Sequence, residues 1–228
     1  MAIFKKIIDF YIDSSIHVAL AAYAFIQITI QGLNISYDDS VSYFGFFGTI
    51  TTYNGIKYFY FFEQRPTKIA LKFKLIFALS LVSFFVSIYY FLQLEPFSKL
   101  VSFFAFCIAL LYGFSFIERL KAARNWIGFK VFLVVLSWTT ITFLLPVVNA
   151  KVDFLQDAFL AGLQRFFLIY ALMCVFEIVD LQFDAISLQT IPQRIGVIRT
   201  KLVGFIFLII FGAFFFRFSA NSSLFRAN

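Results

Sequence analysis

The sequence predicts an all-α membrane protein, a multi-pass transmembrane helical bundle of about seven spans. Three observations predict it. Hydrophobic residues make up 62% of the 228 residues and charged residues only 14%, against roughly 25% charged in a soluble globular domain. Apolar runs of about 20 residues, each able to cross a ~30 Å hydrocarbon core, recur along the chain. No low-complexity linker or fixed-period repeat interrupts them, so we expect one domain over residues 1–228.

The predicted spans follow one another with polar connections between them. They lie near 14–32, 41–62, 70–93, 97–117, 129–148, 156–177 and 197–217. The connections at 34–40, 93–96 and 149–153 are short. The connections at 117–128 and 178–196 are longer and polar, so functional residues are expected there.

Basic residues predict the orientation of these spans. If the N-terminus is cytoplasmic, most of the cations fall on the cytoplasmic side: Lys5, Lys6, Arg65, Lys68, Lys72, Lys74, Arg119, Lys121, Arg124, Lys130, Arg194, Arg199 and Lys201. The opposite side receives Lys99, Lys151 and Arg226, with Arg217 near the outer end of the last span. This asymmetry is the positive-inside pattern. We therefore expect an integral protein of a bacterial cytoplasmic membrane with its N-terminus in the cytoplasm.

Composition also excludes several function classes. The net charge of +7 comes from these loops, which is typical of orientation and of contact with anionic lipid rather than nucleic acid. Two separated cysteines and one histidine give no zinc or dithiol motif. The 37 phenylalanines have two interpretations, either lipid-facing filler or the lining of a cavity for an isoprenoid chain or a carbocation.

Two basic segments are candidates for anion binding. Asn54 and Lys57 lie one helical turn apart near the end of the second span. Lys57 stands in an aromatic stretch, where an ammonium group either reaches the interface or pairs with an anion. The loop after the fourth span carries Arg119, Lys121 and Arg124. This loop is either an orientation signal or a clamp for diphosphate, which guanidinium groups bind through two parallel hydrogen bonds.

The third candidate is a group of acids near the end of the sixth span. Glu177, Asp180 and Asp184 are spaced by three and four residues, so a helix would present them on one face. Such carboxylates at a membrane edge either belong to a solvated helix end or share a cation, and their hard oxygens suit Mg²⁺. Pro192 and Gly196 then predict a turn back into the next span.

This pattern resembles the UbiA superfamily of intramembrane prenyltransferases. The run Glu177-Ile-Val-Asp180-Leu-Gln-Phe-Asp184 is similar to the family's second aspartate motif, DxxxD. The run Gln189-Thr-Ile-Pro-Gln-Arg-Ile-Gly196 resembles its trailing TLPxxxG-like turn. The run Arg124-Asn-Trp-Ile-Gly-Phe-Lys130 is similar to the R-x-I-P-G-x-K-type loop after the family's fourth helix.

The resemblance implies a UbiA-like bundle with a central cavity, and transfer of an isoprenyl group from an isoprenyl diphosphate to an aromatic or other lipophilic acceptor. Mg²⁺ is the implied cofactor, with Glu177, Asp180 and Asp184 as its ligands. Asp180 and Asp184 are the implied catalytic residues. The implied diphosphate contacts are Asn54, Lys57, Arg119, Lys121, Arg124 and Arg194. The partners would be membrane lipid and the two substrates, with no nucleic acid.

Two departures from the family pattern favour an alternative. The family's first motif, NDxxDxxxD, would fall at 54–62, where Asn54 matches and Gly55, Tyr58 and Phe62 replace the aspartates. The family also has nine helices where seven are expected here. The alternative is a non-catalytic UbiA-like protein that binds an isoprenoid lipid or a membrane partner. A transporter using Arg165 and the acids ranks last, because other ionisable residues are few within the spans.

Overall fold

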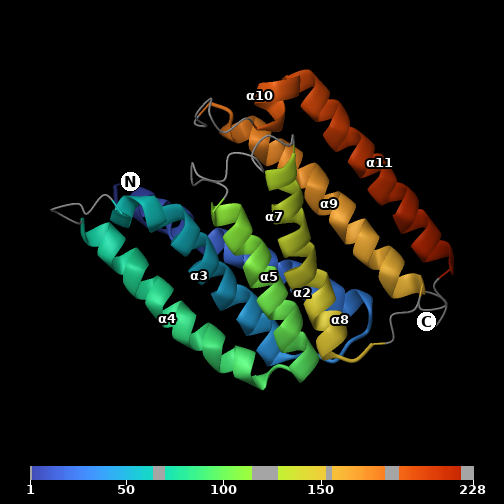
Figure 1. Ribbon diagram of the computed structural model, residues 1–228, viewed down its shortest axis with the longest axis horizontal. Coiled ribbons are helices and arrows are strands. Elements are labelled where there is room, and N and C mark those ends of the chain that lie inside the picture. Colours follow the sequence, from blue (N-terminus) through green and yellow to red (C-terminus); the bar gives the residue numbers. More distant parts are fainter. Residues whose placement is uncertain (1, 64–69, 115–127, 153–155, 183–189, 222–228) are drawn as a thin grey trace. The chain divides into compact units, whose positions relative to one another are not determined.

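The computed structural model describes an all-helical chain (Figure 1). The described residues are 2–63, 70–114, 128–152, 156–182 and 190–221, and all regular elements within them are helices. The chain forms two compact units. Unit 1 comprises Met1–Phe103 and Leu145–Lys151, and unit 2 comprises Phe104–Leu144 and Val152–Asn228. The expectation of one domain stays a prediction.

Several helices have the length and apolar composition of membrane spans. Among the described residues there are five: Leu71–Gln93, Pro96–Gly113, Phe129–Asn149, Ala158–Asp180 and Val197–Phe214. The count becomes six if Phe4–Asp13 and Ile16–Gly32, which are bent by 61°, form one span. The prediction of an all-helical, multi-pass membrane protein is therefore confirmed, and the count of seven spans stays a prediction.

The predicted span at 41–62 accounts for the difference between six spans and seven. It lies within α3 (Asp39–Glu63), a helix of 25 residues that is about 37 Å long at 1.5 Å per residue. Length is therefore sufficient, but α3 is not among the helices apolar enough to span a membrane. Its second half carries the polar residues Thr51, Thr52, Asn54 and Lys57.

Unit 1 is built around three packed helices. These are α2 (Ile16–Gly32), α3 and α4 (Leu71–Gln93), with α2 packed on α3 and α3 on α4. The same unit holds α1 (Ala2–Asp13), the first part of α5 (Pro96–Phe114) and α8 (Leu145–Asn149). Ile26, Ile50 and Ile76 are among its fully buried side chains.

Polar groups connect three loops at one end of unit 1. The Asn149 side-chain nitrogen donates to Asp38 Oδ2 at 2.6 Å, and its oxygen accepts the Glu95 N–H at 3.0 Å. Asp38 Oδ1 accepts the Ser40 N–H at 2.8 Å and so caps the start of α3. Lys151 and Glu95 add an ion pair at 3.0 Å. Asn149 thereby holds together segments far apart in sequence.

Unit 2 is centred on the long helix α9 (Gln156–Asp180). It packs against α7 (Phe129–Thr139) and α11 (Val197–Asn221), and the short helix α10 (Ile191–Ile195) joins α9 to α11 at one end (Figure 1). Val131, Val135, Ile169 and Ile191 form its buried cluster. The packing of α9 on α11 is close, since a Cβ added to Gly204 would lie 3.2 Å from Cys174 Cβ.

A π-helical segment, η2 (Thr140–Leu144), separates α7 from α8. Its cause is Pro146 in the next turn, which has no N–H to donate and whose ring would clash with a carbonyl in a regular helix. The Thr140 and Thr142 hydroxyls donate to the Leu136 and Trp138 carbonyls at 2.8 and 2.7 Å. The predicted span at 129–148 therefore corresponds to one continuous but locally widened helix.

Gly162 of α9 allows close packing on Phe143 of η2. A Cβ at Gly162 would lie 2.9 Å from Phe143 Cε1, and Phe143 is buried. We expect Gly162→Ala to lower the free energy of unfolding by about 1–3 kcal/mol, because the ring must move within a packed core. The control is Gly212→Ala in α11, where a Cβ meets nothing within 4 Å. Equal thermal unfolding of the two variants in detergent would contradict this account.

Candidate functional site

Two of the predicted acids lie in the last turn of α9. The predicted span ended at residue 177, but α9 continues to Asp180 and includes both Glu177 and Asp180. Their spacing of three residues puts the two carboxylates on the same side of the helix. Glu177 is partly buried and Asp180 is exposed. Asp184 lies outside the described residues, so its place on the predicted acidic face stays a prediction.

The segment after these acids forms the predicted turn. α10 begins after Thr190, whose N–H donates to Gln193 Oε1 at 3.1 Å. The Ile191 N–H donates to Glu177 Oε2 at 2.9 Å. Gly196 follows α10 with a φ of 85°, a left-handed region that favours glycine, and α11 begins at the next residue. The predicted break at Gly196 is thus confirmed, whereas Pro192 lies in the first turn of α10 and does not end a helix. Glu177 anchors α10 to α9.

Aromatic side chains pack together two to three turns before Glu177. Tyr170 of α9 and Phe207 of α11 have ring centroids 4.2 Å apart, and Phe167 stacks on Phe207 at 5.7 Å. Other rings of the same helices are exposed, among them Phe176 and Phe205. Phenylalanine therefore serves both in internal packing and on the outer surface of unit 2.

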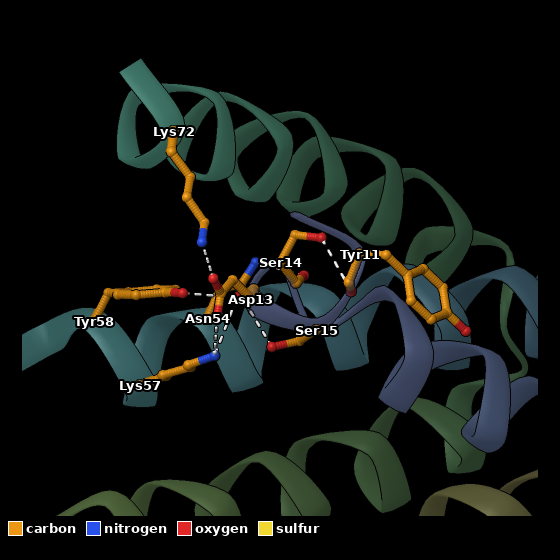
Figure 2. A network of polar contacts seen from close by, with 8 residues as sticks. All are labelled: Tyr11, Asp13, Ser14, Ser15, Asn54, Lys57, Tyr58 and Lys72. Atoms are coloured by element: carbon orange, nitrogen blue, oxygen red, sulfur yellow. Dashed lines mark hydrogen bonds and ion pairs between the residues drawn. The ribbon is translucent and has the colours of Figure 1, made fainter. Parts of the chain in front are cut away.

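The second predicted segment, at the end of α3, belongs to a polar cluster in unit 1 (Figure 2). Lys57 Nζ lies 3.6 Å from Asp13 Oδ1, and Lys72 of α4 pairs with Asp13 Oδ2. The Tyr58 hydroxyl donates to the Asp13 carbonyl at 2.7 Å, and Lys57 Nζ donates to it at 3.3 Å. We call Asp13, Lys57, Tyr58 and Lys72 the Asp13 cluster. It ties the end of α1 to α3 and α4.

Asn54 lies one turn before Lys57 and is almost completely buried, with 3% of its surface exposed. Its side-chain oxygen accepts the Ser15 hydroxyl at 2.8 Å. Its amide nitrogen donates to the Ser14 carbonyl at 3.0 Å (Figure 2). The same nitrogen also donates to Ser80 Oγ at 2.8 Å. Both N–H donors are therefore used. Asn54 holds the break between α1 and α2 against α3 and α4.

The predicted diphosphate contacts therefore have different surroundings. Asn54 is committed to hydrogen bonds within unit 1, whereas the Lys57 side chain is 43% exposed. Arg194 is exposed on α10 of unit 2. The remaining predicted contacts, Arg119, Lys121 and Arg124, lie outside the described residues. Arg165, the cation noted within the sixth span, is buried in α9.

The described residues contain no group of three His, Cys, Asp or Glu side chains arranged to hold a metal ion. Glu177 and Asp180 supply two of the three predicted ligands. Mg²⁺ in proteins is usually bound by one or two carboxylates together with substrate phosphates and water. The exposed Asp180 carboxylate and the Glu177 carboxylate next to it are thus the right kind of donors for Mg²⁺ bound with a phosphate ligand.

Asp13, Ser15 and Lys72 were not predicted as site residues. The available signal was the run Asp13-Ser14-Ser15 directly before an apolar segment, because uncompensated polar groups next to hydrocarbon need partners. That signal indicates a need for partners but does not identify them. Lys72 is 59 residues after Asp13 in sequence, and only the packing of α1 against α4 brings them together.

Comparison with protein-family models, with curated proteins and with solved structures finds no match to this chain. The resemblance to the UbiA superfamily therefore stays a prediction from the sequence motifs at 124–130 and 177–196.

Proposed function

We propose that this chain is a UbiA-like membrane prenyltransferase homologue. It transfers an isoprenyl group from an isoprenyl diphosphate to an aromatic or other lipophilic acceptor. The acidic end of α9 binds the diphosphate group through Mg²⁺. In the proposed orientation this end faces the cytoplasm of a bacterial cell.

One observation carries the proposal. A span-length apolar helix ends in Glu177 and Asp180, and Glu177 is hydrogen-bonded to the turn whose sequence resembles the family's. A carboxylate has about four lone-pair sites, so a hydrogen bond from the Ile191 N–H is compatible with a metal contact at the same carboxylate. The bond also fixes the position of the carboxylate, and a preorganised ligand loses less entropy when it binds.

The residues have distinct roles in this proposal. Glu177, Asp180 and Asp184 supply carboxylate oxygens for Mg²⁺, which when bound neutralises negative charge on the diphosphate and on the departing pyrophosphate. Arg194, exposed on α10, contacts phosphate oxygens through its planar guanidinium group. Asp180 and Asp184 are the proposed catalytic residues. Arg119, Lys121 and Arg124, which precede α7 in sequence, would add further phosphate contacts.

The proposal predicts Mg²⁺-dependent binding of an isoprenyl diphosphate. We expect purified protein in nanodiscs to bind labelled farnesyl diphosphate at least ten times more tightly with Mg²⁺ than with chelator. In the double variant Asp180→Asn, Asp184→Asn, Mg²⁺ should no longer increase the affinity for farnesyl diphosphate, because amide groups do not neutralise a divalent cation. A matched control is Asp9→Asn in α1, an acid of unit 1 that lies outside the proposed site.

The binding proposal is wrong if chelator leaves the affinity of the wild-type protein unchanged. It is also wrong if the double variant responds to Mg²⁺ as the wild type does. Geranyl and longer isoprenyl diphosphates, run in parallel, extend the test to other chain lengths.

A second candidate function is a non-catalytic UbiA-like protein that binds an isoprenoid lipid. The observation in its favour is Asn54, the remnant of the first motif, whose amide is fully hydrogen-bonded within unit 1. This candidate predicts ligand binding without release of pyrophosphate. Acceptor-dependent pyrophosphate release would exclude it and favour the enzyme.

A further inference from the structure

A groove runs along unit 1 between α3 and α4, with a volume of about 540 Å³. On the α3 side the lining residues are spaced three or four positions apart, so they lie on one face of the helix. They are Thr51, Asn54, Gly55 and Tyr58. Its α4 side is apolar apart from Ser80, and consists of Phe73, Ile76, Phe77, Ser80, Leu81 and Phe84. The Asn54 amide, which belongs to this lining, is already hydrogen-bonded to the Ser14 carbonyl and to Ser80 Oγ. The groove therefore offers an apolar surface.

The dimensions of the groove suit a hydrocarbon chain. Phe73 and Phe84 are eleven residues apart on α4, which corresponds to about 16 Å along the helix. One leaflet occupies half of a ~30 Å hydrocarbon core, so this length matches a chain crossing a single leaflet. Phe77, Leu81 and Phe84 are 44–55% exposed on α4, a helix apolar enough to span the membrane. The groove is thus open to the lipid side.

The Asp13 cluster lies at one end of this groove. Tyr58 and Phe73, which line that end, have their rings 5.7 Å apart and are the chain neighbours of Lys57 and Lys72. Two ammonium groups face one carboxylate, so the cluster carries one surplus positive charge. Both lysine side chains are about 40% exposed. Each ammonium group has three donors, which allows it to bind an anion in addition to Asp13.

We propose that this groove binds an anionic phospholipid of the surrounding bilayer. One acyl chain lies along α3 and α4 from Tyr58 towards Phe84, and the phosphate contacts Lys57 and Lys72. The surplus charge selects an anionic headgroup, and the apolar groove selects a chain rather than free phosphate. This site lies wholly in unit 1 and does not depend on the acids of unit 2 or on Mg²⁺.

Gly55 provides a direct test of the chain position. A Cβ at Gly55 meets nothing within 4 Å, so Gly55→Leu begins in open space and places its side chain in the groove. Gly48→Leu is the matched control on the same helix, because its Cβ meets only the Phe44 ring, at 4.0 Å. In Mg²⁺-free detergent solution, we expect phosphatidylglycerol to bind the wild-type protein and the Gly48→Leu variant equally. Gly55→Leu should weaken that binding at least tenfold, and thermal unfolding verifies that both variants are folded.

The charge of the cluster provides a second, independent test. Asp13→Asn leaves the backbone carbonyl that accepts Tyr58 and Lys57, but raises the surplus charge from one to two. It should strengthen phosphatidylglycerol binding several-fold over phosphatidylcholine. Lys72→Gln should weaken the same preference. A cluster with only a structural role would not move lipid preference in opposite directions in these two variants.

Three results would overturn the proposal. The first is equal phosphatidylglycerol binding by the Gly55→Leu and Gly48→Leu variants. The second is a shift of lipid preference in the same direction for Asp13→Asn and Lys72→Gln. The third is displacement of phosphatidylglycerol by farnesyl diphosphate at a much lower concentration without Mg²⁺, with loss of that effect in Gly55→Leu, which would assign the groove to the isoprenyl ligand instead.

Discussion

Replacement of Asn54 by leucine is expected to lower the free energy of unfolding by about 3 kcal/mol or more, since each buried polar group left without a partner costs about 1–3 kcal/mol. Leucine has a similar size but cannot accept the Ser15 hydroxyl or donate to the Ser14 carbonyl. Both serines are buried, with 3% and 0% of their surface exposed. Thermal or denaturant unfolding in a fixed detergent measures the effect.

Two controls distinguish the effect of losing the Asn54 hydrogen bonds from a general destabilisation of α3. Thr52→Ala, two residues earlier on the same helix, should change stability by much less. Ser15→Ala combined with Asn54→Leu should cost less than the sum of the single changes, because both remove the same hydrogen bond. Strict additivity, or an Asn54→Leu variant as stable as the wild type, would contradict the structural role of Asn54.

Replacement of Glu177 by alanine is expected to have the second largest effect on stability. It removes the charged acceptor of the Ile191 N–H, and Ile191 is buried in the core of unit 2. Hydrogen bonds to charged groups contribute about 1.5–3 kcal/mol, and we expect a loss of unfolding free energy of that size. Protease susceptibility at the turn between α9 and α11 provides a second measurement.

Glu177→Gln is the matched control for this prediction. Glutamine retains an acceptor oxygen for the Ile191 N–H but carries no charge. Its stability should lie close to that of the wild type. If Glu177→Ala is as stable as Glu177→Gln, the bond to Ile191 does not hold the turn and its proposed role is wrong.

Much of the fold could be predicted because hydrophobic length is a direct physical requirement of a membrane span. The segments at 70–93 and 197–217 correspond closely to α4 and α11. Other features depend on packing. Pro146 was visible in the sequence, but whether it would end, kink or widen its helix depended on the threonine hydroxyls and neighbours around it. The break between α1 and α2 is likewise hydrogen-bonded to Asn54, which is about forty residues away.

In the candidate site too, some features follow from the local sequence and others depend on packing. The turn after Glu177 could be predicted because proline, glycine and capping residues act locally. The bond from Ile191 to Glu177 spans 14 residues and follows no local rule. The role of Asn54 was less predictable still, since its partners come from the α1–α2 break and from α4. Family motifs identify positions, whereas the surrounding contacts decide what a side chain at each position can do.

The most direct test of the proposed function uses Glu177→Gln, the variant expected to keep the fold and lose the charge. The measurement is farnesyl diphosphate affinity in nanodiscs as Mg²⁺ is raised, for wild type and variant at equal thermal stability. We predict that Mg²⁺ increases the affinity of the wild type at least tenfold and that of the variant much less. Equal Mg²⁺ dependence in the two proteins, or none in either, would contradict a diphosphate site at the acidic end of α9.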